Sequence, residues 1–506
     1  MGLHTETRSP ASGPPPENAP DDRGALIDTP DQRNALIDTI SLAALFAAIV
    51  GERGVLARPS ELATYSSDGL PGYRLRPRLA VFPTRKQQVI DVVRLLAREK
   101  TPFVARGAGT GLSAGALASG DAVVIGLNRL TRIISVDPVN RLAVVEPGAV
   151  NVTLTRAASA HGLHYAPDPS SQTACTIGGN VAENSGGPHC LKYGVTLNHV
   201  VALEVILANG EIITLGNADG GEVEGYDLLG AFIGSEGCFG IALEITVKLT
   251  QNPQGVRTML ADFMSIDAGA RATSAIIASG ILPAALEMMD GPTIRAVEAS
   301  IYAAGYPADA DAVLLIELDG LDAGLDTDVK RVEQFCLAAG ARTVRIAANE
   351  AERARLWQGR KKAFGAMGRI APDLVVQDAV IPRTKLPDVL REIAAIAARW
   401  QIQVCNVFHA GDGNLHPNIG YDSRNADESK RVGFAMRDIM QACIDAGGTI
   451  TGEHGIGLDK LEYMPQIFSA ESLAAQCALR DAFDPERRAN PGKVVPVHSC
   501  REWRGA

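Results

Sequence analysis

Three glycine-rich segments, far apart in the chain, place the strongest constraint on its fold. They are Arg106 to Gly111, Thr176 to Gly187 and Gly234 to Ile241. Because glycine carries no Cβ, backbone N–H groups in such loops can approach a bound group closely. The second segment lies in a stretch from Pro167 to Tyr193 with little regular periodicity, and long loops in compact domains usually bind something. We therefore expect the three loops to form one cradle for a large ligand.

The first loop, taken alone, supports several interpretations. Gly109 to Ala114 fits a relaxed dinucleotide-binding fingerprint, which requires a helix to open at the loop. Here Gly115 to Gly120 leads into another strand, which argues against a Rossmann site. The P-loop pattern G-x-x-x-x-G-K-[ST] does not occur in the sequence. A plain structural turn remains an alternative for this loop alone.

Strand-like and helix-like runs are mixed along the chain and predict an α+β protein. The Asn209-Gly210 dipeptide predicts a hairpin between two of the strands. The predicted strands are Leu79 to Pro83, Phe103 to Arg106, Ala122 to Leu127, Ile133 to Val136, Leu142 to Glu146, Val200 to Leu207, Glu211 to Leu215, Ile241 to Leu249, Thr258 to Phe263, Ala312 to Leu318 and Thr343 to Ala347. The predicted helices are Gln88 to Lys100, Val152 to His161, Asp267 to Ser279 and Asp328 to Ala339.

The length of 506 residues predicts two or three domains, because single cores rarely grow so large. The first 20 residues carry five prolines with polar neighbours and predict a mobile tail. The character of the sequence changes near Asn252-Pro253, where a second α+β unit begins. We expect a disordered tail over residues 1–40, a first domain over 41–251, a second over 252–460 and a helical segment over 461–506.

Composition excludes several classes of function. The net charge of −10 argues against a nucleic-acid partner, since phosphate binding needs a basic face. The eight cysteines are scattered outside any C-x-x-C motif, which excludes a Cys-ligated iron–sulfur cluster of the usual spacing and fits the cytoplasm. The sequence has no run of about 18 apolar residues and no signal-peptide core, so we expect neither a spanning helix nor secretion.

Two segments that carry histidines form a second group of candidate functional residues. His409 to Asn418 follows an apolar run, and its internal Gly-Asp-Gly-Asn turn signal predicts a hairpin that brings His409 and His416 together. Glu453 and His454 lie in a second glycine-flanked segment. Two histidines and one carboxylate suit an open metal site, with a fourth position left for water or substrate. Hydrogen-bonded structural histidines are the alternative that spacing alone leaves open.

The three loops, in this order, resemble the FAD domain of the vanillyl-alcohol-oxidase-type flavoproteins over nearly all of the chain beyond residue 40. Within that family, the match is closest to the FAD-binding subunits of bacterial glycolate oxidases and to the D-lactate and D-2-hydroxyglutarate dehydrogenases. The resemblance implies a two-part, PCMH-type FAD-binding domain, an α+β FAD-linked oxidase C-terminal domain as substrate cap, and a C-terminal helical segment that returns to the flavin. Some relatives attach the flavin to a histidine in the pyrophosphate loop, which this chain lacks, so we expect non-covalent FAD.

The resemblance also implies which residues bind the cofactor. Arg106 to Thr110 would hold the pyrophosphate, Ile241 would contact the adenine end, and Asn490 would close over the flavin. The full expected set is Arg106, Gly107, Ala108, Gly109, Thr110, Gly111, Pro167, Asp168, Ser171, Thr176, Gly178, Gly179, Asn180, Ser185, Gly186, Ile241 and Asn490.

By the same resemblance, His409, His416 and Glu453 would bind a divalent metal, typically zinc, beside the flavin. Asn418 would touch the substrate, and His454 would act as general base on its hydroxyl. This chemistry is coherent, because a metal lowers the pKa of a bound hydroxyl and a neutral histidine can then take the proton.

Arg360 resembles the family's carboxylate-binding arginine, and a planar guanidinium binds a carboxylate bidentately. The alternative is a solvated helix face, on which the neighbouring cations are idle; these are Arg353, Arg355, Lys361 and Lys362. The stretch Asp373 to Asp378 is apolar at its centre and supplies no lysine for a second carboxylate, and Phe364 narrows the pocket. Both features favour a short substrate.

The sequence thus predicts FAD-dependent oxidation of glycolate, and of D-lactate, to the 2-keto acid by hydride transfer to flavin. Glycolate oxidase assemblies contain a second flavin-domain-like subunit and an iron–sulfur subunit, so electrons would leave through such partners, with at most peripheral membrane contact. The alternatives are a stand-alone D-lactate dehydrogenase using quinone or cytochrome, a zinc hydrolase, and a flavin- or nucleotide-binding module without activity. The hydrolase alternative leaves the glycine loops unexplained.

Overall fold

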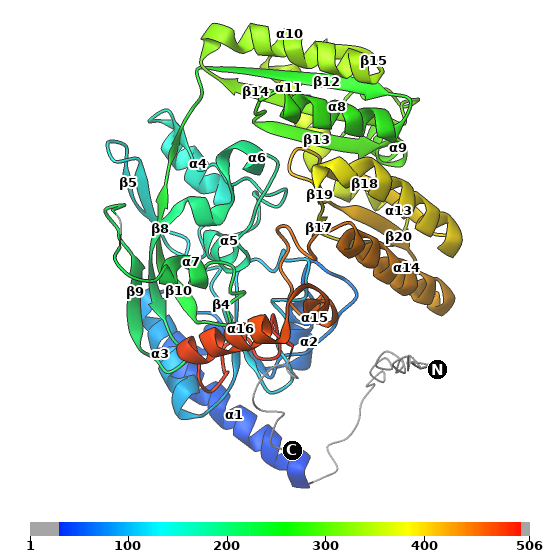
Figure 1. The fold of residues 1–506 in the computed structure, drawn as a ribbon. Helices are drawn as coiled ribbons and strands as arrows, with labels where there is room; N and C mark the ends of the chain where they lie inside the picture. The colour runs from blue at the N-terminus through cyan, green and yellow to red at the C-terminus, as the bar shows by residue number, and fades with distance from the viewer. Residues whose placement is uncertain (1–29, 222, 497–506) are drawn as a thin grey trace, which may run out of the picture.

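The computed structural model describes residues 30–221 and 223–496, which form two α+β units and a C-terminal helical segment (Figure 1). Helix α1 (Pro30–Val50) begins inside the predicted tail, and its side chains Leu42 and Phe46 pack into the core of the first unit. Residues 1–29, the rest of that predicted tail, lie outside the described residues. Among the described helices, none combines the length and the apolar composition that a bilayer-spanning helix requires.

A four-stranded sheet opens the first unit, in the order β1-β2-β4-β3. Its strands are β1 (Val55–Leu56), β2 (Leu79–Val81), β3 (Phe103–Arg106) and β4 (Val123–Gly126). Strands β2, β4 and β3 run parallel, and α3 (Lys86–Arg98) makes the crossover from β2 to β3. Helix α3 was predicted from the sequence, and its apolar side chains Val89, Val92, Val93 and Leu96 are fully buried against this sheet and α1. The first glycine loop leaves from the end of β3, at an edge of the sheet.

An antiparallel five-stranded sheet, in the order β5-β6-β10-β8-β9, completes the first unit. Its strands are β5 (Ile133–Asp137), β6 (Leu142–Val145), β8 (Val200–Ile206), β9 (Ile212–Gly216) and β10 (Ile241–Lys248). The predicted Asn209-Gly210 hairpin joins β8 and β9, with Gly210 at φ 88°, a conformation that favours glycine. A two-stranded ribbon of β7 (Leu163–His164) and β11 (Thr250–Gln251) lies beside this sheet.

Short helices connect these strands. They are α2 (Pro59–Leu62), α4 (Asn151–Ser159), α5 (Ile177–Glu183), α6 (Cys190–Tyr193) and α7 (Leu228–Phe232), with 3₁₀ turns η1 (Glu52–Gly54), η2 (Ala63–Tyr65) and η3 (Thr196–Asn198). Helices α5 and α6 lie in the stretch that the sequence predicted to be loop. Thr176 begins α5, because its Oγ1 accepts a hydrogen bond of 3.2 Å from the N–H of Gly179.

The second unit is built on a nine-stranded sheet whose main path is β15-β12-β14-β13-β18-β19-β17, with β20 pairing both β16 and β18. Its strands are β12 (Gly255–Phe263), β13 (Ala285–Asp290), β14 (Ala312–Gly320), β15 (Ala341–Ile346), β16 (Asp373–Val376), β17 (Ala379–Val380), β18 (Gln403–His409), β19 (Asn414–Leu415) and β20 (Pro417–Tyr421). The predicted hairpin between β18 and β19 is present, and the register sets Glu287 of β13 opposite His409 of β18.

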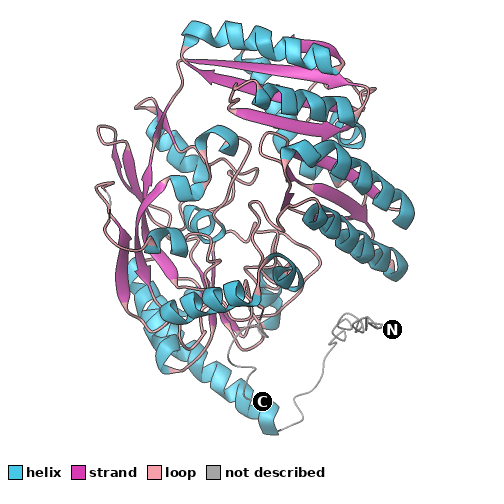
Figure 2. Cartoon of the chain, viewed as in Figure 1, coloured by secondary structure: helices cyan, strands magenta, loops and turns pink. Residues whose placement is uncertain are grey.

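Helices flank this second sheet (Figure 2). They are α8 (Ile266–Ala278), α9 (Gly291–Glu298), α10 (Asp322–Ala339), α11 (Glu350–Lys361), α12 (Ala363–Met367), α13 (Leu386–Trp400) and α14 (Ala426–Asp445), with η4 (Arg383–Lys385). We call this second unit the cap, because residues of its strands β18 and β20 line one cavity together with the first unit's glycine loops.

The chain then returns to the first unit. After η5 (Leu461–Tyr463), α15 (Met464–Ile467) and α16 (Ala470–Phe483) lie along the lower part of Figure 1. Arg480 of α16 donates hydrogen bonds to the carbonyls of Ala489, Asn490 and Lys493, at 3.1, 3.1 and 2.8 Å. These bonds stabilise the C-terminal segment, in which Ala489 pairs with Phe103 at the start of β3.

Candidate active site

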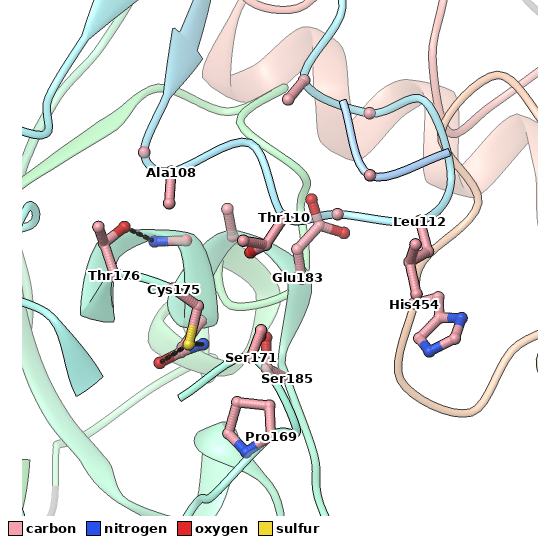
Figure 3. Close-up of a pocket in the computed structure, with 18 of the residues that line it drawn as sticks. Ala108, Thr110, Leu112, Pro169, Ser171, Cys175, Thr176, Glu183, Ser185 and His454 are labelled. Carbon is pink, nitrogen blue, oxygen red and sulfur yellow. Dashed lines mark hydrogen bonds between the residues drawn. The ribbon is translucent and has the colours of Figure 1, made fainter. Parts of the chain in front are cut away.

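A cavity of about 700 Å³ lies between the glycine loops of the first unit and the cap. This volume is within the range of ligand and cofactor sites. All three predicted glycine loops contribute to its wall, and residues from α11, β18, β20 and the segment around His454 close the other side. In Figure 3, Ala108 and Thr176 lie at one side of the view and His454 at the opposite side, with Thr110, Ser171 and Ser185 between them.

Close backbone contacts explain why glycines line this cavity. A Cβ on Gly107 would overlap with Thr176 Oγ1, the oxygen that caps α5. A Cβ on Gly178 would lie 2.6 Å from Pro147 Cβ and 2.8 Å from the Pro147 carbonyl oxygen. No side chain fits at either position without displacing a neighbour. Gly107 therefore lets the first two loops pack side by side, and Gly178 lets the second loop pack on Pro147.

Most of the residues expected to bind the cofactor meet at this cavity. Those that line it are Arg106, Gly107, Ala108, Gly109, Thr110, Gly111, Ser171, Thr176, Gly178, Gly179, Asn180, Ser185 and Ile241. Four expected residues do not line the cavity wall: Pro167, Asp168, Gly186 and Asn490. Asn490 instead donates hydrogen bonds to the carbonyls of Gly115 and Glu236, at 3.0 and 2.6 Å. It thus joins the segment after the first loop, and the third loop, to the C-terminal segment.

Arg106 has a structural contact in addition to its place on the cavity wall. Its Nη2 donates to the Ser67 carbonyl at 2.7 Å. Burial lowers the pKa of this guanidinium, while nearby Asp68 opposes that shift. The side chain predicted to contact the pyrophosphate therefore also binds the backbone of Ser67.

The predicted metal ligands lie together at the cap end of the cavity. His409 Nε2 lies 3.3 Å from Glu453 Oε1, and His416 Nε2 lies 3.2 Å from the same oxygen. Both imidazoles are buried, with the histidines 5% and 7% exposed. The hairpin of β18 and β19 carries His409 and delivers His416 just beyond it, as the turn signal predicted.

The hydrogen bonds on the far side of each imidazole determine what these atoms can bind. His409 Nδ1 faces the Glu287 carboxylate at 2.8 Å, and His416 Nδ1 faces the Gln377 carbonyl oxygen at 3.3 Å. Both partners only accept hydrogen bonds, so each Nδ1 carries a proton, and a ring without a second proton presents a lone pair at Nε2. Three acceptor atoms then face one another, and a divalent cation or extra protons must offset their repulsion. This donor set fits a metal with two imidazole ligands and one carboxylate ligand.

The pKa values of Glu453 and His409 in this cluster are shifted far from their ordinary values. Burial penalises the Glu453 carboxylate, but its bonds to His409 and His416 outweigh that effect and hold its pKa well below the usual value. Burial likewise opposes protonation of His409, and Glu287 and Glu453 outweigh it, so the pKa of His409 is raised well above the ordinary value. The cluster thus stabilises positive charge at the point where three lone pairs meet.

His454 lies next to the predicted metal ligands and faces the cavity. Its ring stacks on that of His416, with centroids 4.9 Å apart and an interplanar angle of 8°. Burial lowers its pKa to about 4, and its Nδ1 has no hydrogen-bond partner among the described residues. A neutral imidazole with an unpaired, buried nitrogen can accept a proton from a ligand in the cavity.

Arg360 and Asn418 complete the polar groups on the cap side. Arg360 of α11 is 5% exposed and pairs with the buried Glu287, and its Nε has no partner within the described part of the chain. Asn418 of β20 donates to the His416 carbonyl at 2.6 Å, and its buried Oδ1 is likewise unpartnered among the described residues. A buried polar atom without a hydrogen-bond partner lowers the stability of the fold. Both side chains can therefore bind a polar ligand through these atoms.

The comparisons with known proteins agree with this geometry. Residues 77–216 match the family described as FAD binding domain, and residues 252–494 match FAD linked oxidases, C-terminal domain. The glycolate oxidase subunit GlcD of Escherichia coli K12 is 46% identical over 450 residues, which cover 89% of this chain and 90% of GlcD. The chain belongs to the FAD-linked oxidases.

Other relatives of this FAD-linked oxidase support the same assignment. A D-lactate dehydrogenase of Anaerostipes hadrus is 31% identical, over 83% of this chain and 90% of that enzyme. The solved structure of p-cresol methylhydroxylase superposes with a TM-score of 0.77 at 16% identity, covering 92% of this chain and 98% of that one. The second likeness bears on the fold alone and confirms the predicted PCMH-type architecture. The chain is therefore an FAD-dependent oxidoreductase, which excludes the hydrolase alternative.

The cavity fits the FAD that this family binds. Its wall is open where glycines replace side chains, and the buried hydroxyl of Ser235 on the third loop lacks a partner among the described residues. Both features suit a large cofactor held by backbone and small polar groups.

Two buried carboxylates that the sequence analysis missed hold the segment carrying His454. Asp378 is fully buried and accepts hydrogen bonds from the N–H groups of Gly452, Glu453 and His454, the last at 2.9 Å. Lys460 pairs with Asp378 at 3.2 Å. Burial raises the pKa of Asp378, but Lys460 outweighs that effect and holds this pKa well below the usual value.

Glu236 of the first unit holds the same segment from the other side. It accepts hydrogen bonds from the N–H groups of Ile456 and Gly457 at 2.6 and 2.8 Å. Both units therefore position His454.

The alternative of a solvated helix face assumed that the cations near Arg360 have no role. Two of them instead form ion pairs. Arg353 pairs with the buried Glu317 at 2.8 Å, and Lys361 pairs with Asp168 at 2.8 Å. His189, which the sequence analysis did not single out, pairs with Asp168 at 2.9 Å and Glu317 at 3.2 Å. Asp168 thus belongs to an ion-pair network between the units. Its carboxylate faces His189 and Lys361, so it does not line the cavity wall.

Proposed function

We propose that this FAD-linked oxidase oxidises glycolate, and D-lactate as a second substrate, to the corresponding 2-keto acid. The observation that carries the proposal is the placement of His454, Arg360 and the His409–His416–Glu453 cluster on one side of a cavity whose other side is the FAD cradle. The 46% identity to an enzyme named glycolate oxidase subunit supports the choice of substrate.

The chain's own residues have distinct tasks in this reaction. Arg360 binds the substrate carboxylate through the guanidinium edge that Glu287 leaves free, and Asn418 orients the substrate by a hydrogen bond. His454 accepts the proton of the substrate hydroxyl, which its lowered pKa permits because the ring is neutral at pH 7. Bound FAD, held without a covalent bond, supplies the hydride acceptor, and a divalent metal supplies a Lewis acid.

We assign the metal site to His409, His416 and Glu453, with zinc as the expected ion. The three converging acceptor atoms support this assignment, because without a cation their lone pairs repel one another. Phe364 and Val376 supply apolar surface to the cavity beside Arg360 and favour a short substrate.

Electrons leave the chain through partners in this proposal. The GlcD relatives are named as subunits, and the sequence supplies no cysteine cluster for iron and sulfur. We expect a second flavin-domain-like subunit and an iron–sulfur subunit, in the cytoplasm, with membrane contact only through them. The isolated chain should then turn over glycolate faster with an artificial dye than with quinone, and equal rates without any partner would contradict this part.

A stand-alone D-lactate dehydrogenase using quinone or cytochrome is the second candidate. The 31% identity to a D-lactate dehydrogenase over 83% of the chain favours it specifically. Steady-state kinetics on glycolate, D-lactate, L-lactate and D-2-hydroxyglutarate separate the two. A kcat/KM highest for glycolate supports the main proposal, one highest for D-lactate supports the alternative, and no turnover of any of the four refutes both. Absorbance near 450 nm in the same sample reports bound flavin.

A further inference from the structure

Glu287 lies where the metal cluster and the substrate-binding arginine meet. It is in the middle of β13, its residue is 0% exposed, and the sheet register places it directly opposite His409 of β18. Cross-strand partners have their Cβ atoms only about 5 Å apart, so this carboxylate reaches the imidazole without a long flexible stem. No task in the reaction described above requires a carboxylate at this position.

The contact with His409 involves both oxygens of Glu287. His409 Nδ1 lies 2.8 Å from Oε1 and 3.0 Å from Oε2. A carboxylate can only accept, so it fixes the proton on Nδ1 and directs the lone pair of Nε2 toward Glu453. Carboxylates in this relation to a metal-binding histidine fix the ring orientation and raise its basicity.

The same carboxylate pairs with Arg360 through Oε2, the ion pair that joins β13 to α11. It occupies Nη2 of the guanidinium and leaves Nε, which has no partner among the described residues, for a ligand. Because the guanidinium is planar and rigid, holding one edge fixes the direction of the other. Glu287 thus determines where the arginine can place a substrate carboxylate.

We propose that Glu287 is the positioning residue that sets the separation between the metal and the guanidinium, and so selects acids whose hydroxyl is on the carbon next to the carboxylate. The inference rests on the proposed function, in which the hydroxyl lies at the metal and the carboxylate at Arg360. A 3-hydroxy acid inserts one more carbon, about 1.5 Å of chain, between these two groups. Since one buried side chain holds both anchors, neither can shift alone to accommodate it.

Glu287→Gln tests this because an amide has one oxygen where the carboxylate has two. If the oxygen faces His409, the amide N–H₂ faces the Arg360 cation; if it faces Arg360, the N–H₂ donates to His409 Nδ1 and moves the ring proton to Nε2. We expect zinc affinity of the FAD-loaded protein to fall about 10- to 100-fold, measured by chelator competition and metal content. We also expect KM for glycolate to rise and the kcat/KM preference for glycolate over 3-hydroxypropanoate to shrink.

Asp290→Asn is the matched control, since Asp290 is a buried carboxylate at the end of the same strand. It accepts from the N–H groups of Thr293 and Asn406, at 3.0 and 2.7 Å, and touches neither anchor. Its zinc affinity and substrate preference should match the parent protein even where its stability falls. Equal losses of zinc affinity in both variants would show a merely structural role and overturn the proposal.

Breaking a buried ion pair leaves an uncompensated charge, so Glu287→Gln can fail to fold. The double variant Glu287→Met with Arg360→Met removes both charges, and its zinc affinity should still be at least 10-fold below that of Arg360→Met alone. Unchanged zinc affinity in the Glu287 variants overturns the role of Glu287 while the parent still oxidises glycolate. If the parent protein binds zinc but oxidises no 2-hydroxy acid, the proposed function is overturned. The zinc affinities of the Glu287 variants then still show whether Glu287 positions His409.

Discussion

The ammonium of Lys361 lies 2.8 Å from the carboxylate of Asp168, and this ion pair joins the cap to the FAD-binding unit directly beside the cavity. Lys361 follows Arg360 on α11, so one of these neighbouring residues is the proposed substrate-binding cation and the other makes a contact between the units. On the other side of Asp168, His189 bridges to Glu317 of β14. The network stabilises the cap in the position that encloses the cavity.

Lys361→Met should loosen this contact. The pair is mostly buried, with side chains 21% and 13% exposed, and Asp168 keeps only His189 as a charged partner after the change. We expect a loss of about 1–2 kcal/mol in the free energy of unfolding, measured by urea denaturation of the FAD-loaded protein. Lys362→Met, one residue further on, is the control and should lose less. A parent-like stability for Lys361→Met would show that the pair contributes nothing.

The same network predicts a loss of stability in alkali. Burial disfavours the charged imidazole, but Asp168 and Glu317 outweigh it and raise the pKa of His189 to about 10. The unfolded chain releases this proton near pH 6.5, so the stabilisation is complete below about 6.5 and is lost as pH rises toward 10. The free energy of unfolding should therefore fall with a slope of at most about 1.4 kcal/mol per pH unit in that window. In His189→Gln this contribution to the slope should disappear, and an unchanged profile would contradict the assignment.

Local signals predicted local structure well. The Asn209-Gly210 turn, helix α3 and the β18–β19 hairpin form as expected, because each depends on residues close in sequence. Helix α5 was missed, since Gly178 and Gly179 in its first turn are poor helix formers and interrupt the apolar periodicity. The cap Thr176 was the signal that could have indicated it.

Residues whose roles depend on long-range pairing could not be predicted. Glu287 meets His409 only because β13 and β18, which are 122 residues apart at this pair, are neighbours in the sheet. Asp378 and Glu236 approach the His454 segment from different units for the same reason. The sequence indicated the histidines by their glycine-rich context, whereas Glu287 and Asp378 lie in or next to strands that carry no such signal. Glu236 lies within the third glycine-rich segment, but nothing in that segment indicated that it contacts the His454 segment.

Thr176→Val tests the cradle between the first two loops. The change removes the oxygen that caps α5 and places a methyl group where it faces Gly107. We expect a loss of about 1 kcal/mol in stability from the cap and, in addition, a lower FAD content after purification. Ser265→Ala removes the corresponding cap of α8, far from the loops, and should lower stability without lowering FAD content. Similar FAD contents in both variants would argue against the cradle.

His454→Gln should separate catalysis from cofactor binding. If His454 takes the hydroxyl proton, turnover of glycolate should fall at least about 100-fold, the usual minimum contribution of a general base. The 450 nm absorbance should stay, since the segment is held by Asp378 and Glu236 through backbone N–H groups rather than by the ring. His161→Gln, at an exposed histidine, is the control for the general effect of the substitution. Retention of most turnover would remove His454 from the role of base.

Phe364→Ala tests whether the cap limits substrate length. The ring lines the cavity beside Arg360 while 39% of the residue stays exposed, so its loss should widen the pocket without collapsing the core. The kcat/KM for D-2-hydroxybutanoate should rise relative to that for glycolate, because the longer chain gains space while the carboxylate still reaches Arg360. The expected shift is about 10-fold or more, since one methylene typically provides that much discrimination in an apolar pocket and D-2-hydroxybutanoate has two carbons more than glycolate. An unchanged ratio would mean that the substrate chain points away from α12, and that another wall sets the length limit.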